Sequence, residues 1–304
     1  MGGSFRLNLS WSASRGKEFA RCPRENWFGR YASWGWWKER PRGEKFEVLM
    51  HKQLTSLPAF TGLCVHEAIE LWFELRRGGE TLSGDELYEE ARERFREGWR
   101  ASTGGLWRDD PRKCAHLIEH HYDEDLSEER TGKARERLEA ASRFFTDSPL
   151  LKTARDAHPD TWLALESLDS FPFSGVDVYA VPDFVHREGD EVHIWDWKTG
   201  RPREADRFQL SVYALFAMHK WGTQPEAIRL HAAYLGEGSV ESREVSSDEL
   251  EETSENIAAS LAPMQDGHYD PDEEEVDLSK FPPSGAPKEC PGCRFRGICP
   301  EAVL

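Results

Sequence analysis

Two β-rich segments separated by a short turn constrain this chain most. Residues 174–187 and 191–198 are rich in β-branched and aromatic residues, and the Glu-Gly-Asp sequence at 188–190 between them favours a tight turn. The pattern predicts an antiparallel hairpin. Such a pair is the nucleus of a sheet, so an all-helical fold is excluded from the outset.

The predicted hairpin carries three charged residues in an informative arrangement. Side chains two positions apart on a strand share a face, so Asp196 and Lys198 project together, and the neighbouring strand brings Asp183 towards Asp196. Two converging carboxylates repel each other unless a cation lies between them, and hard oxygen ligands suit Mg²⁺ or Mn²⁺. A lysine beside such an ion can orient or deprotonate water, or stabilise charge on a phosphate. The alternative is an ordinary Asp–Lys pair on a surface hairpin.

The rest of the chain predicts an α/β fold. Apolar residues at helical spacing predict helices over 62–77, 84–99, 133–147, 205–221 and 247–261, and further strands are expected at 161–168 and 227–236. We expect a short helix followed by a loop within residues 1–50, and no regular element in the final 40 residues. Helices, a β meander, then a helix and a strand favour one α/β domain with a helical insertion.

Composition limits the function classes. The formal net charge of −17 argues against a general electrostatic binder of nucleic acid but leaves room for a local basic groove. We interpret the acidic runs at 123–129 and 270–277 as solvated surface. With 12 Trp and 16 Phe the 304 residues can form a sizeable core. No stretch is apolar enough to span a bilayer, and the N-terminus lacks the apolar core of a secretory signal, so we expect a soluble, cytoplasmic protein.

The cysteines form a second constellation. Three lie within ten residues near the C-terminus and one lies far upstream: Cys290, Cys293, Cys299 and Cys22. Disulfides are rare in the cytosol, so clustered cysteines there more often bind metal, and four thiolates suit Zn²⁺ or an iron–sulfur cluster. The remaining two, Cys64 and Cys114, are expected to be small buried side chains.

Six short motifs follow one another along the chain: CPREN (22–26), GLCVHEA (62–68), VPDFV (181–185), IWDWKTG (194–200), QLSVY (209–213) and CPGCRFRGICP (290–300). Each is weak alone, but the ordered set resembles the RecB-like branch of the PD-(D/E)XK nuclease superfamily. That branch includes the nuclease domains of RecB and AddB and the small CRISPR-associated RecB-like exonucleases.

The resemblance implies a restriction-endonuclease-like core, with a mixed central sheet flanked by helices, inside a single domain. It assigns the catalytic core to about 160–262 and a helical insertion to about 78–155. The N- and C-terminal parts, about 1–60 and 280–304, would form a region stapled by the Fe–S cluster.

The resemblance also implies roles for single residues. The metal ligands would be His66, Asp183, Asp196 and the carbonyl of Trp197, and Lys198 would be the catalytic lysine. Gln209 and Tyr213 would match a Q-x-x-x-Y helix and share one helical face towards the site or the DNA backbone. Cys22, Cys290, Cys293 and Cys299 would hold a structural [4Fe-4S] cluster, with zinc as the alternative occupant.

These residues predict a Mg²⁺- or Mn²⁺-dependent DNA nuclease. We expect an exonuclease that acts on free or single-stranded DNA ends in repair and recombination, in phage defence or in CRISPR adaptation. The alternative is a non-catalytic or partner-dependent DNA-binding subunit of a helicase–nuclease or CRISPR integration complex. The chain has no Walker-type sequence, so a helicase motor would be a separate protein.

Two other clusters have simpler interpretations. His120 and His121, with Asp123 and Glu124, could suggest a second metal site, but a polar helix end is the preferred interpretation. The Arg- and Trp-rich stretch 21–40 fits either a surface that stacks single-stranded DNA or core packing around the cluster.

Overall fold

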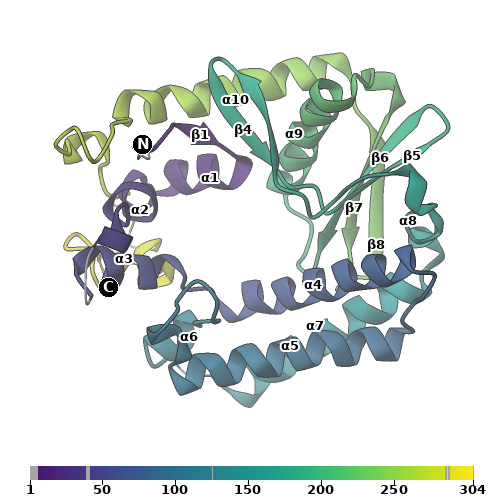
Figure 1. Cartoon of the computed structure of the whole chain (residues 1–304), viewed down its shortest axis with the longest axis horizontal. Coiled ribbons are helices and arrows are strands. Elements are labelled where there is room, and N and C mark those ends of the chain that lie inside the picture. Colours follow the sequence, from purple (N-terminus) through teal and green to yellow (C-terminus); the bar gives the residue numbers. More distant parts are fainter. Residues whose placement is uncertain (1–5, 39–41, 125, 285, 287, 304) are drawn as a thin grey trace.

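The computed structural model describes residues 6–38, 42–124, 126–284, 286 and 288–303. Two β-sheets lie among helices (Figure 1). The α-helices are α1 Ala13–Arg21, α2 Pro23–Trp27, α3 Glu44–Lys52, α4 Leu57–Arg77, α5 Gly84–Gly104, α6 Ile118–His121, α7 Glu128–Asp147, α8 Lys152–Asp156, α9 Glu204–Trp221 and α10 Ser247–Gly267. The strands are β1 Ser10–Trp11, β2 Trp162–Leu165, β3 Asp169–Phe173, β4 Val176–Ala180, β5 Phe184–Glu188, β6 Glu191–Lys198, β7 Ile228–Tyr234 and β8 Ser239–Glu244. A π-helical turn covers Phe28–Ala32, and short 3-10 turns include Trp36–Lys38 and Cys290–Gly292.

The larger sheet is mixed and has the strand order β2-β5-β6-β7-β8. Only β6 and β7 run parallel, joined by the crossover helix α9; the other neighbours are antiparallel. The predicted hairpin is confirmed: Glu188 pairs with Glu191, which leaves a two-residue turn. Gly189 takes φ 59° at the first turn position, where a residue with a side chain would be strained.

The two faces of this sheet are covered by different helices, as Figure 1 shows: α9 and α10 on one face, α4, α5 and α7 on the other. Strand β6 alternates accordingly. Val192 and Ile194 join the apolar core on the α9 side, whereas Trp195 and Trp197 join the core on the α4 side. Because β6 is buried on both faces, the alternation of the strand decides which face each of its polar residues points to. Asp196 continues the α9-facing row.

The segment 174–187 is not one strand, which corrects the expected single element. Its first half, β4, pairs with β1 and β3 in a separate three-stranded sheet, and its second half, β5, belongs to the larger sheet. The break falls at Val181-Pro182, since proline has no N–H to donate to a ladder. The chain therefore changes sheets one residue before Asp183. Strands β3 and β8 are also additional to the predicted set.

Residues 1–50 are more helical than expected. The structure replaces the short helix and loop with α1, α2, the π-helical turn and α3. Long-range contacts stabilise them: the Arg24 guanidinium donates to the Phe281 carbonyl at 2.9 Å, and the Phe28 ring stacks on Phe295 with centroids 5.3 Å apart. Figure 1 shows the C-terminal segment beside α2 and α3. Beyond α10, the described residues of the C-terminal segment hold short 3-10 turns, as predicted for most of the final 40 residues. In the part of the chain that the structure describes, no helix is long and apolar enough to cross a membrane.

Candidate active site

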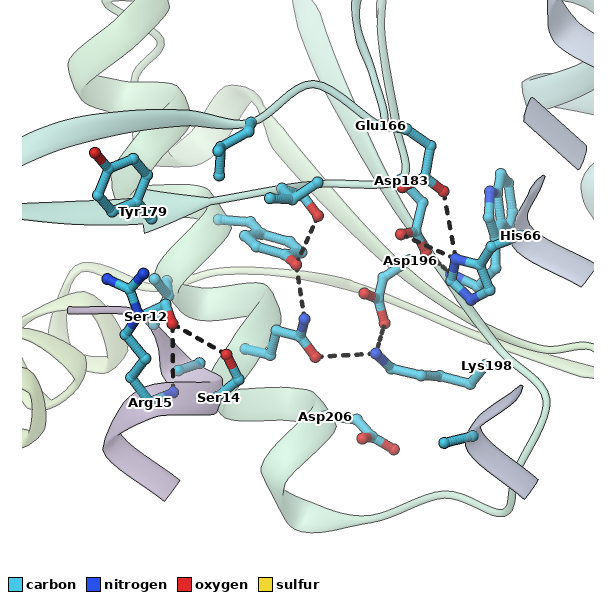
Figure 2. Close-up of a pocket in the computed structure, with 18 of the residues that line it drawn as sticks. Ser12, Ser14, Arg15, His66, Glu166, Tyr179, Asp183, Asp196, Lys198 and Asp206 are labelled. Carbon is cyan, nitrogen blue, oxygen red and sulfur yellow. Dashed lines mark hydrogen bonds and ion pairs between the residues drawn. The ribbon is translucent and has the colours of Figure 1, made fainter. Parts of the chain in front are cut away.

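A cavity of about 990 Å³ contains every residue assigned to the predicted metal and catalytic site. Asp183, which precedes β5, and residues from the end of β6, from α4 and from α9 line one part of it, and residues from β1, α1 and β4 line another. Figure 2 shows His66, Glu166, Asp183, Asp196 and Lys198 gathered together, with Ser12, Ser14, Arg15 and Tyr179 on the opposite side of the view.

Asp183 and Asp196 meet because of the hairpin register. Phe184 pairs with Trp195 in the antiparallel hairpin. Asp183, which precedes Phe184, therefore lies opposite Asp196, which follows Trp195. Asp183 is held in place by the main chain of β6: the Trp197 N–H donates to its Oδ2 at 2.5 Å. Both carboxylates are buried, with 5% of Asp183 and 1% of Asp196 exposed. The indole of Trp197 lies in the core on the other face, and the role of its carbonyl as a ligand stays a prediction.

His66 reaches the same place from α4. Its Nδ1 lies 3.4 Å from Asp183 Oδ1 and 3.3 Å from Oε1 of a residue that the sequence did not single out, Glu166. Burial alone would lower the pKa of His66, but the two carboxylates outweigh it and raise the pKa well above its usual value. The protonated imidazole of His66 therefore places a positive charge beside the carboxylates of Glu166 and Asp183. These three ligand atoms lie within 4.8 Å of one another, and no other such group occurs among the described residues.

Glu166 is a candidate site residue that the sequence analysis did not single out. It follows β2 directly and takes φ 44°, an uncommon conformation for a residue with a side chain. Its N–H donates to the Asp183 carbonyl at 3.0 Å, which fixes it beside the site. Strain of this kind costs about 1–3 kcal/mol and persists mainly where function requires it. The only signal in the sequence was an acidic residue ending an apolar strand.

Lys198 is positioned by a chain of hydrogen bonds from α9. Its Nζ lies 2.6 Å from Asp196 Oδ2 and donates to Gln209 Oε1 at 2.9 Å. The Gln209 amide donates to the Tyr213 hydroxyl at 2.6 Å, and that hydroxyl donates to the Val181 carbonyl at 2.8 Å. Gln209 and Tyr213 lie one helical turn apart and so share a face, as predicted.

Electrostatics make Asp196 the most perturbed acid in the cavity. Burial, reinforced by the charge of Asp183, raises its pKa to about 7, although Lys198 opposes the shift. Burial would lower the pKa of Lys198, but the two aspartates outweigh it and raise the pKa. The 2.6 Å contact between them is an ion pair without hydrogen-bond alignment, so buried Oδ2 of Asp196 keeps capacity to bind a cation.

The cavity is locally basic although the protein is acidic. Six cationic side chains line it, against four carboxylates. The cations are Arg15, Arg30, Arg137, Lys198, Arg201 and Arg203; the acids are Glu166, Asp183, Asp196 and Asp206. The net negative charge of the chain, −17 in total, therefore lies outside the cavity, and the cavity is suited to a polyanion.

The four predicted cluster cysteines are free thiols around one small cavity, which Cys22, Cys290, Cys293 and Cys299 all line. No three of these described thiols come within 4.8 Å of one another. Burial, together with the nearby charge of Glu25, raises the pKa of Cys293 to about 12. The four cysteines therefore line one cavity, but in the described residues their sulfur atoms are not gathered into the cluster site that the sequence predicts. Of the remaining two, Cys64 is buried as expected, whereas Cys114 is only half-buried.

The two other clusters form no further metal site in the described residues. His120 Nδ1 contacts the Ser102 hydroxyl at 2.8 Å, and Glu124 pairs with Arg296 at 2.6 Å. In the described part of the stretch 21–40, Phe28 and Tyr31 are buried, with Phe28 stacked on Phe295, whereas Trp37 is 43% exposed. The other aromatic residues there are half-buried: Trp27, Trp34 and Trp36.

Comparison with known families decides the relationship. A family profile described as the PD-(D/E)XK nuclease superfamily matches residues 10–300. The chain belongs to this superfamily. The mixed sheets flanked by helices fit the superfamily's restriction-endonuclease-like fold, and membership indicates a nuclease with DNA as its substrate. Nucleases of this superfamily use divalent metals.

Individual relatives add little to the superfamily assignment. No curated protein matches the chain significantly. A solved structure titled "Crystal structure of SSO0001" matches with 17% identity over 58% of this chain and 78% of that chain, at a TM-score of 0.29. A similarity this low carries no argument about the site.

Proposed function

We propose that this protein is a Mg²⁺- or Mn²⁺-dependent deoxyribonuclease of the RecB-like type that degrades DNA from its ends. The observation that carries the proposal is the convergence of Glu166, Asp183, Asp196, His66 and Lys198 in one basic cavity. The PD-(D/E)XK membership supports hydrolysis of a phosphodiester bond, and the ordered RecB-like motifs support action on ends.

The donor set fits a hard divalent cation. Glu166 and Asp183 offer carboxylate oxygens within reach of one another, and His66 adds a nitrogen. Asp196 adds a buried oxygen that lacks an aligned donor. Oxygen-rich sets with one imidazole suit Mn²⁺ and Mg²⁺ better than soft metals. When the cation binds, His66 would release its proton, and the fraction of Asp196 that is protonated would release its proton too.

When bound, the ion would polarise the scissile phosphate and lower the pKa of a water molecule. The chain's own contribution is position and charge. Lys198, fixed by Asp196 and Gln209, holds an ammonium group at the edge of the carboxylates, where it can orient the attacking water and stabilise charge on the phosphate. Tyr213 fixes the amide of Gln209 through a hydroxyl whose pKa is raised well above its usual value by burial, so it stays a neutral donor.

We also propose that Cys22, Cys290, Cys293 and Cys299 hold a [4Fe-4S] cluster that ties about 1–60 to 280–304. A single tetrahedral zinc ion brings thiolates to about 3.8 Å from one another, whereas a cubane cluster holds them farther apart. No three of the described thiols lie within 4.8 Å of one another, and what supports the cluster is that all four thiols line one cavity.

The activity is tested with end-labelled linear and circular DNA, each single- and double-stranded, incubated with Mn²⁺, Mg²⁺ or EDTA. The proposal predicts loss of linear DNA only with metal, and the release of label at one end first would give the polarity. Cleavage of circular DNA at the same rate would replace end-directed action with endonuclease action. No cleavage by protein with its cluster intact would favour the partner-dependent or binding-subunit role.

A further inference from the structure

Two arginines at the far side of the cavity lack a carboxylate partner. Arg15, in the first turn of α1, and Arg30, in the π-helical turn, both line the cavity, and neither forms an ion pair with any described residue. Both guanidinium groups contact the Ser10 hydroxyl, Arg15 at very short range and Arg30 at 3.4 Å. The Nε of Arg30 is buried without a hydrogen-bond partner.

The positive charge around this pair is not balanced locally. Burial lowers the pKa of both arginines, and repulsion from Arg30 lowers the pKa of Arg15 further. The pKa of the half-buried Lys52 is lowered by burial and by arginines that include Arg15 and Arg30. Glu18, whose charge acts on Arg15, forms its ion pair with Arg294 at 2.5 Å. Like charges held together without a counterion are destabilising unless an anion joins them.

The surrounding groups are those that recognise phosphate. Arg15 lies at the start of α1, whose N-terminal end favours anions, and the Ser12 and Ser14 hydroxyls flank it in Figure 2. The Tyr179 ring lies 5.5 Å from the Arg15 guanidinium and is half-buried, so one face of an aromatic ring borders the same space. Arginine, hydroxyls and an aromatic ring together are typical of grooves that hold a single strand.

Building on the proposed nuclease function, we infer that Arg15 and Arg30 form a second phosphate-binding subsite, which holds a phosphate of the substrate strand away from the scissile one. The cavity is continuous between this pair and the carboxylate cluster, so one strand can occupy both. The bound group is either a terminal phosphate monoester or an internal phosphodiester, which share the same chemistry.

The test is binding rather than cleavage. Fluorescence anisotropy would follow short single-stranded DNA with a 5′-phosphate, a 3′-phosphate or two hydroxyl ends, in EDTA and over a range of salt. Each of Arg15→Met and Arg30→Met should weaken binding about tenfold and reduce the salt slope by about 0.7. Arg135→Met, an exposed arginine on α7 outside the cavity, is the matched control and should bind as the wild type does.

Equal losses on all three strands would assign an internal phosphodiester; a loss confined to one phosphorylated end would assign a terminal phosphate. Arg15→Lys and Arg30→Lys, which keep the charge and most of the packing, should keep the salt slope, so a folding defect in the methionine variants is recognised. Binding by all four variants that equals Arg135→Met would overturn the subsite. The two proposals can fail separately. If the wild type cleaves DNA but the methionine variants bind DNA as the control does, only the subsite proposal is wrong. If the methionine variants lose binding but the wild type does not cleave DNA, only the nuclease proposal is wrong.

Discussion

Buried histidines in the larger sheet should make this protein sensitive to mild acid. Rings from three neighbouring strands stack across the sheet: His186 on His193 at 4.9 Å and His193 on His231 at 5.2 Å. The His186 Nε2 accepts from the Trp195 indole N–H at 3.2 Å. Burial, reinforced by repulsion between the rings, lowers the pKa of His186 to about 4 and that of His231 to about 3.

The sign and size of the effect follow from these values. Both folded pKa values lie below the unfolded value of about 6.5, so between these limits the unfolded chain binds protons that the folded chain does not. Stability is therefore lost as the pH falls below about 6.5. At pH 5.0 each histidine favours the unfolded state by about 1.36 × 1.5, or about 2 kcal/mol. Together, His186 and His231 remove about 4 kcal/mol of the roughly 5–15 kcal/mol that a domain has.

Urea unfolding of the wild type and His186→Gln at pH 7.5 and 5.0 measures this directly. The glutamine can still accept from Trp195, so the variant loses mainly the titration. Its destabilisation relative to the wild type should shrink by about 2 kcal/mol between the two pH values. His158→Gln, at a side chain that is 73% exposed, controls for removing one histidine and should show no such change. If the free-energy difference between His186→Gln and the wild type is the same at both pH values, the reasoning is wrong.

Three further predictions concern the site and its supports. Gly236→Ala should lower the free energy of unfolding by about 1–3 kcal/mol in urea, because its Cβ would lie 2.6 Å from the Thr199 carbonyl, next to Lys198; an unchanged midpoint would contradict the close approach. Glu166→Gln should weaken Mn²⁺ binding at least tenfold by calorimetry, whereas wild-type affinity would remove this residue from the ligand set. Cys293→Ser should abolish bound iron and acid-labile sulfide and expose the C-terminal segment to limited proteolysis; zinc without iron in anaerobically purified wild type would overturn the cluster.

Much of the site could be predicted because it depends on local geometry. A hairpin turn and the two-residue period of a strand predicted that Asp183, Asp196 and Lys198 lie together. The turn of a helix put Gln209 and Tyr213 on one face, but their place in this site came from the resemblance to a family. None of these steps needs knowledge of distant packing. His66 required the resemblance to a family, since a histidine on an amphipathic helix carries no sign of its partners.

What could not be predicted depends on contacts between distant segments. Glu166 reaches the site through a positive φ and a main-chain bond to Asp183, which no periodicity encodes. The N-terminal helices are stabilised by residues more than 250 positions away, such as Phe281 beside Arg24. The unpaired arginines were hidden by the acidic composition of the whole chain, which says nothing about charge inside one cavity.

The central claim is that this carboxylate cluster cleaves DNA with a divalent ion. The most direct test compares wild type and Asp196→Asn on end-labelled single-stranded DNA with Mn²⁺, with an EDTA control, after circular dichroism shows that both are folded. The structure predicts metal-dependent loss of label by the wild type and at least a 100-fold slower loss by the variant. Equal cleavage by Asp196→Asn, or cleavage by the wild type in EDTA, would contradict the account.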